Sequence, residues 1–135
     1  MSALDDVCRS ILSSVDDGLG CAVVDLESGL LLASAHNVPY FTQSYLDAVS
    51  AAAVDMFRGR TVTNFENLIP QQRGVPSRRL TSEIQMTTEH TYHFMLVLPN
   101  KPNALAVLIT GRRANLGFGW AAVRNSVAHI EPLVP

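Results

Sequence analysis

Two histidines, His90 and His93, are the first residues whose type suggests a metal or acid–base site. They lie three positions apart in a segment with the pattern of a β-strand, where side chains at that spacing point to opposite faces. The two rings therefore cannot share one ion, and a structural zinc site requires four ligands. We interpret both as turn or surface histidines, and the sequence predicts no metal site.

The two cysteines, Cys8 and Cys21, could act as nucleophiles if His36 or His129 served as the base. Cys8, however, lies on the apolar stripe of a predicted helix, and a thiol in apolar surroundings is inert. Two cysteines are also too few for a disulfide scaffold. We therefore expect buried free thiols.

The remaining short motifs do not indicate catalysis. Adjacent acids, Asp5/Asp6 and Asp16/Asp17, stand at predicted helix ends, where capping and turns explain them. Gly18-Leu-Gly20 precedes a strand instead of following one, and Gly117-Phe-Gly119 lacks the rest of a dinucleotide-binding fingerprint. The sequence thus predicts no catalytic residue, no cofactor and no enzyme.

Composition and charge limit the function classes further. The chain has 135 residues, of which 47% are hydrophobic and 16% charged, which fits one domain with a modest core. Its longest apolar runs are seven or eight residues, too short to span a membrane. Acids near the N-terminus, where a signal peptide would be basic, predict a cytoplasmic protein. Residues 1–55 hold eight acids and one arginine, whereas residues 56–135 hold four acids and nine bases. The net charge of the whole chain is −2, which argues against a nucleic-acid-binding protein.

The hydrophobic pattern predicts three main helices and five strands. Apolar residues recur with helical spacing over 4–15, 42–58 and 116–130, with Ser2 and Asn115 as caps. We expect a glycine after Asp17 to end the first helix by adopting the left-handed conformation. Residues 21–26 and 30–35 form a predicted hairpin, because a three-residue turn with Gly29 separates two apolar runs. Strands follow at 80–87, 92–98 and 104–109, and Gly117 and Gly119 are expected to let the last helix lie close to the sheet.

Two of these elements offer surplus surface. The helix over 42–58 is apolar around more of its circumference than one sheet can cover, so something else should pack on it. The strand over 80–87 alternates, with Ile84 and Met86 on one side, which is typical of a sheet edge. An exposed edge must be paired, covered or charged. Either residues 60–79 fold back over it, or a twin strand pairs with it about a twofold axis.

The segment 59–79 is rich in arginine. Apolar residues between Val62 and Ile69 predict a short helix there, with Thr63 and Glu66 spaced like a capping box and Pro70 as its end. Residues 71–79 are expected to form an exposed loop. The arginines are either solvated or a contact patch for a partner: Arg58, Arg60, Arg73, Arg78 and Arg79.

The order of elements, together with two segments, resembles the roadblock/LC7 family. Residues 20–34 (GCAVVDLESGLLLAS) resemble its first hairpin, and residues 109–118 (ITGRRANLGF), with the helix after them, resemble its closing strand and helix. The resemblance implies an α+β, profilin-like fold: a five-stranded antiparallel sheet of order 2-1-5-4-3, with the second helix on one face and the first and last on the other. It also implies dimerisation through the second helix and third strand. Members are non-enzymatic regulators or scaffolds of small Ras-like GTPases, or light chains of motor complexes.

Two function hypotheses follow. The first is a homodimeric, non-catalytic module, formed by residues 1–135 with 59–79 as an extra segment, that binds a small GTPase or another signalling protein. Its predicted dimer interface comprises Leu46, Val49, Ala53, Met56, Phe57, Glu83, Ile84, Gln85 and Met86. The alternative is a small-molecule sensor, for which Tyr92, His93 and His36 are the only candidate polar groups in the core.

Overall fold

The computed structural model describes residues 2–74, 76 and 79–135, and over these residues the predicted helices and strands are present. In chain order the elements are α1 (Ala3–Ser13), β1 (Gly18–Asp25), β2 (Leu31–His36), α2 (Gln43–Arg58), α3 (Arg60–Arg73), β3 (Glu83–Thr87), β4 (Thr91–Leu98), β5 (Lys101–Gly111), α4 (Leu116–Ile130) and the 3₁₀ turn η1 (Glu131–Leu133). None of the helices in the described ranges is both long and apolar enough to cross a membrane.

The five strands form one antiparallel sheet in the order β2-β1-β5-β4-β3, which confirms the predicted topology. β5 lies at the centre and pairs with β1 and β4 along most of its length. β3 is the last strand on its side, so the prediction that it forms an edge is also confirmed.

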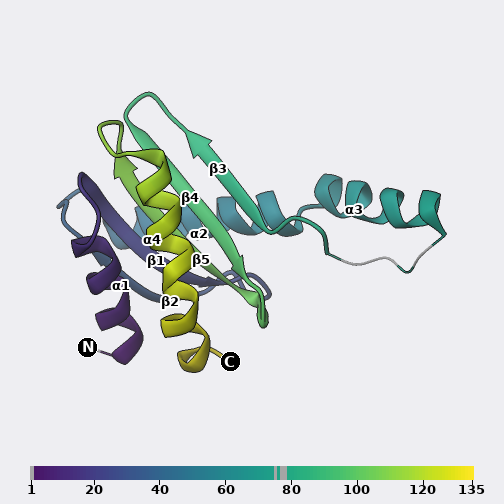
Figure 1. Ribbon diagram of the computed structural model, residues 1–135, viewed down its shortest axis with the longest axis horizontal. Helices are drawn as coiled ribbons and strands as arrows, with labels where there is room; N and C mark the ends of the chain where they lie inside the picture. Colours follow the sequence, from purple (N-terminus) through teal and green to yellow (C-terminus); the bar gives the residue numbers. More distant parts are fainter. Residues whose placement is uncertain (1, 75, 77–78) are drawn as a thin grey trace.

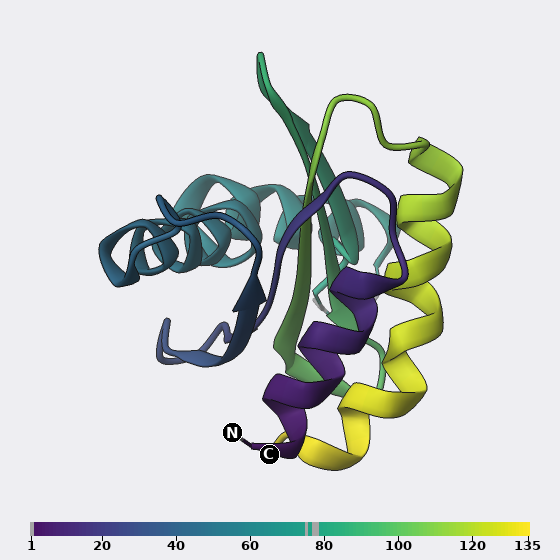
Figure 2. The same ribbon diagram turned by 90° about the vertical axis from the view of Figure 1, so that its left-hand side faces the viewer.

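Helices cover both faces of the sheet. α1 and α4 pack on one face and α2 on the other, as predicted (Figures 1 and 2). The central strands are therefore buried on both sides, which explains why their sequences are apolar without alternation. Cys8 and Phe94 belong to the core under α1 and α4, whereas Phe57 and Met95 belong to the core under α2.

The predicted helix starts are confirmed by their caps. Ser2 and Asp5 form a reciprocal capping box, and Asn115 accepts the backbone N–H of Phe118. The expected glycine stop after α1 is wrong, because Asp17 takes the left-handed conformation there, at φ 58°. Asp and Asn tolerate that conformation best among the non-glycine residues. Gly119 does bring α4 close to the sheet: a Cβ at this position would lie 2.5 Å from the Phe94 ring.

α3 differs from its prediction. The helix runs through Pro70 to Arg73 and ends at Gly74, which has φ 69°. Pro70 cannot donate a backbone N–H, but it stands in the last turns of α3 and the residues after it remain helical. Thr63 and Glu66 lie inside the helix and form no capping box, since Gly59 is the N-cap. α3 points away from the sheet (Figure 1), so its described residues leave the β3 edge uncovered and that alternative is wrong.

Candidate interaction surface

α2 uses one face to contact its own sheet. Leu46, Ser50, Ala53 and Phe57 follow each other at helical spacing and are buried within the chain. Ala53 and Phe57 have no exposed surface at all, and Leu46 keeps 8%. The structure therefore moves Leu46, Ala53 and Phe57 from the predicted dimer interface to the core.

The next face of α2 borders an apolar groove of about 290 Å³ between α2 and the β3–β4 hairpin. The groove is lined by Tyr45, Ala48, Val49, Ala52 and Met56 from α2, Met86 from β3, Thr88 from the following turn, and His93 and Met95 from β4. Val49, Met56 and Met86 were predicted as interface residues, and the fold brings them together. Ala48, Ala52, Met95 and His93 were not predicted.

His93 is the one buried ionisable side chain of the groove lining, and it corrects the sequence interpretation. It is 5% exposed on β4 instead of lying at the surface, whereas His90 is exposed in the turn. Burial lowers the pKa of His93, so the ring is neutral at physiological pH. A ring nitrogen lies 3.0 Å from the Thr91 hydroxyl oxygen. The groove is thus uncharged as well as apolar.

β3 presents two different faces. Ile84 and Met86 pack toward the α2 core, while Glu83 and Gln85 reach the other face and bind α4. Arg124 donates two hydrogen bonds to the Glu83 carboxylate, at 2.9 and 2.7 Å, and these lower the pKa of Glu83. Trp120 Nε1 donates to Gln85 Oε1 at 3.0 Å. Glu83 and Gln85, predicted as interface side chains, are therefore engaged within the chain, and only their backbone lies at the free edge.

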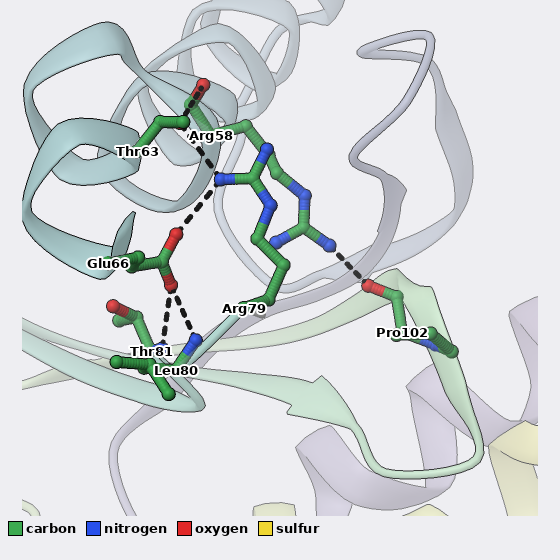
Figure 3. A network of polar contacts seen from close by, with 7 residues as sticks. All are labelled: Arg58, Thr63, Glu66, Arg79, Leu80, Thr81 and Pro102. Carbon is green, nitrogen blue, oxygen red and sulfur yellow. Dashed lines mark hydrogen bonds and ion pairs between the residues drawn. The ribbon is translucent and has the colours of Figure 1, made fainter. Parts of the chain in front are cut away.

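The arginine-rich segment contains a network of polar contacts around Glu66 (Figure 3). Glu66 is 1% exposed and accepts the backbone N–H groups of Leu80 and Thr81, at 2.8 and 2.9 Å. Arg79 donates to the same carboxylate at 2.9 Å and to the Thr63 hydroxyl at 2.8 Å. Burial alone would raise the pKa of Glu66, but the N–H of Thr81, the Arg79 guanidinium and the N–H of Leu80 outweigh it and hold that pKa below its ordinary value. The network ties α3 to the segment that enters β3.

The four predicted arginines that the structure describes do not form one patch. Arg58 donates to the Pro102 carbonyl at 2.6 Å, and Arg79 belongs to the Glu66 network, so both hold the chain together. Arg60 and Arg73 are exposed at the two ends of α3. Arg78 lies outside the described residues. Sequence alone could not identify Glu66 as the centre of a network, because its partners lie 13 to 15 positions away.

The candidate nucleophiles are buried as predicted. Cys8 and Cys21 are free thiols, 0% and 4% exposed. The neighbouring Cys8 side chain and burial raise the pKa of Cys21 well above its ordinary value, so the thiol stays protonated. Among the described residues no three His, Cys, Asp or Glu side chains gather as a metal site would require.

Comparison with known proteins supports the same view of the fold. No protein-family model and no curated protein matches the chain. A roadblock/LC7 domain from Streptomyces avermitilis is similar in structure, with a TM-score of 0.69 and 13% identity over 98% of both chains. The gliding protein MglB from Thermus thermophilus is also similar, with a TM-score of 0.70 and 15% identity over 98% of this chain and 90% of that one. A structure of MglB with a tetrameric arrangement has a TM-score of 0.71 and 14% identity, over 96% of this chain and 85% of that one.

Proposed function

We propose that this chain, which has the fold of roadblock/LC7 domains, is a non-catalytic interaction module that forms a homodimer through α2 and β3 and binds a signalling protein. The observation that carries the proposal is the apolar groove beside the free β3 edge. The dimer interface would comprise the groove residues Val49, Ala52, Met56 and Met86, together with the backbone of β3.

A second copy can satisfy both features at once. The free N–H and C=O groups of β3 would pair with the same strand of the partner, and the apolar surface beside them would be buried by the partner's α2. Stable interfaces bury about 800 Å² on each partner, more than a groove alone provides, so edge and groove are needed together.

For the further partner we retain the class that the resemblance implies, a small Ras-like GTPase. The alternative of a small-molecule sensor is less well supported, because two of its three candidate polar groups lie on opposite faces of the sheet. Tyr92 packs with the α1 and α4 core, whereas His93, its neighbour on β4, lines the groove on the opposite face. What remains in the groove is an apolar surface of the kind that protein interfaces bury.

Substitution of Ala52 by lysine tests the dimer. Ala52 is exposed and lines the groove, so Ala52→Lys costs the monomer little but would place a charge in the buried interface. Ala51→Lys is the matched control, since Ala51 is exposed on the same helix and outside the groove lining. Light scattering after size exclusion should give a dimer for the unmodified chain and Ala51→Lys, and a monomer for Ala52→Lys. A chain that is monomeric at micromolar concentrations, or a dimer that both variants leave intact, contradicts the proposal.

The partner class is tested with the dimer as bait. Isothermal calorimetry with small Ras-like GTPases, each loaded with GDP and with a GTP analogue, should detect binding that differs between the two nucleotides. A capture from the native cytosol that yields reproducible partners but no GTPase would refute this part while leaving the dimer standing.

A further inference from the structure

α3 (Arg60–Arg73) forms an arm that leaves the body of the molecule. It contacts α2 at its start and then extends beyond the β3 edge of the sheet (Figure 1). Its apolar side chains are left without cover: Phe65 is 56% exposed and Leu68 is 49% exposed. The two side chains are three positions apart, so they lie on the same face of the arm.

The direction of the arm is fixed by the chain itself. Gly59 ends α2 and begins α3: its N–H donates to the Asp55 carbonyl, and its own carbonyl accepts from Thr63, both at 2.9 Å. A Cβ at position 59 would lie 2.4 Å from the Asp55 carbonyl oxygen, so the junction requires glycine. Glu66 then anchors the arm to Leu80 and Thr81. The arm is therefore held outward instead of folding onto its own sheet.

Symmetry determines what lies beyond that edge, given the dimer of the proposed function. A twofold axis that pairs β3 with β3 in one continuous antiparallel sheet stands normal to the sheet. It places both α2 helices on the same face, running in opposite directions. The end of α2 from which the arm departs then points across the partner, toward the start of the partner's α2. The arm has 14 residues and is about 21 Å long, the width of about four strands.

The start of α2 offers a complementary surface. Tyr40 is 64% exposed there and packs edge-on against Phe41, which stacks on Tyr45 with ring centroids 4.5 Å apart. The charges of the two surfaces are also complementary. Asp47 is exposed on the first turns of α2, whereas Arg60 and Arg73 are exposed on the arm. Each chain thus carries an uncovered apolar, basic arm and an uncovered aromatic, acidic surface that could receive it.

We propose that the arms are exchanged: in the dimer, α3 of each copy lies along the α2 face of the other, with Phe65 and Leu68 against the surface formed by Tyr40 and Tyr45. This inference rests on the proposed dimer but goes beyond it. The arm adds a second contact region, remote from the twofold axis, and each dimer contains that contact twice.

Disulfide formation between two singly substituted chains tests the exchange. A tagged Tyr40→Cys chain is mixed with an untagged Phe65→Cys chain, allowed to exchange subunits and oxidised. We expect a cross-linked heterodimer, and little cross-linking with Asn64→Cys, which is exposed at the same height of the arm but turned by about 100° around the helix. Native Cys8 and Cys21 are buried and stay unreactive. In parallel, Phe65→Ser should raise the dimer dissociation constant by about tenfold or more, because an apolar side chain buried at each arm is lost, whereas Asn64→Ser should not.

The outcomes separate the two proposals. A chain that light scattering finds monomeric overturns both the dimer and the exchange. A dimer in which Phe65→Cys cross-links no better than Asn64→Cys, and in which Phe65→Ser has no effect on dissociation, overturns the exchange alone. Dimers that cross-link preferentially through Phe65 and weaken with Phe65→Ser support it.

Discussion

Glu66→Gln should loosen the α3 arm while leaving the sheet intact. The carboxylate accepts two backbone N–H groups through one oxygen and the Arg79 guanidinium through the other. Glutamine keeps one acceptor oxygen and turns an amide NH₂ group toward one set of donors. Hydrogen bonds to a buried charge contribute about 1.5–3 kcal/mol each. The Arg79 bond counts for less, because that side chain is 43% exposed and screened by water. We therefore expect a loss of about 3 kcal/mol in the local opening free energy.

Hydrogen exchange of the Leu80 and Thr81 amides measures this loss directly. Both N–H groups bind Glu66 in the folded chain, so a loss of about 3 kcal/mol should speed their exchange about a hundredfold. Amides of β5 should keep their protection, because the arm projects from the body and opens by itself. Glu89→Gln is the matched control, since that carboxylate is exposed. Exchange at Leu80 and Thr81 within a few-fold of the control would refute the role given to Glu66.

The remaining predictions concern the core and pH. Gly119→Ala should destabilise the chain by about 1–3 kcal/mol, because the new Cβ meets the buried Phe94 ring. Thermal unfolding measures this loss. Gly117→Ala is the control: its Cβ meets only the Asn115 side chain, at 3.2 Å, so the melting temperature should change little. The pKa of His93 is lowered in the folded chain, so the unfolded chain binds a proton more readily. The free energy of unfolding should therefore fall as the pH drops below the ordinary histidine pKa of 6.5. In thermal unfolding, His93→Gln should remove this part of the dependence of stability on pH. An unchanged dependence would show that other groups cause it.

The parts of the fold that depend on neighbouring residues in the chain, such as helix caps and fully apolar strands, could be predicted from the sequence. Ser2 and Asn115 each accept a backbone N–H at the start of a helix, and a cap of this kind needs only the next three residues. β4 and β5 are apolar without alternation because helices cover both faces of the sheet. Burial on both faces could therefore be inferred before the partners of either strand were known.

Features that depend on distant partners were not predictable in this way. Pro70 is a local signal for a helix end, yet the helix continues to Gly74, where the left-handed conformation stops it. Glu66 has the spacing of a capping residue but is buried by a segment that returns more than ten positions later. Leu46, Ala53 and Phe57 were assigned to the wrong face of α2, since composition shows that a helix has surplus apolar surface but not which side the sheet covers.

In the proposed dimer, the two sides of β3 indicate on which face of the sheet the second copy buries apolar surface. On the α4 side, the polar side chains of the strand are already bound, Glu83 by Arg124 and Gln85 by Trp120. These contacts fix the strand at the edge of the sheet. On the α2 side, Met86 borders a groove that its own chain leaves open. A partner that pairs with the backbone edge and also buries this groove lies on the α2 side of the sheet. The α3 arm leaves α2 toward that same space (Figure 1), so in the proposed dimer the edge, the groove and the arm all meet one second copy.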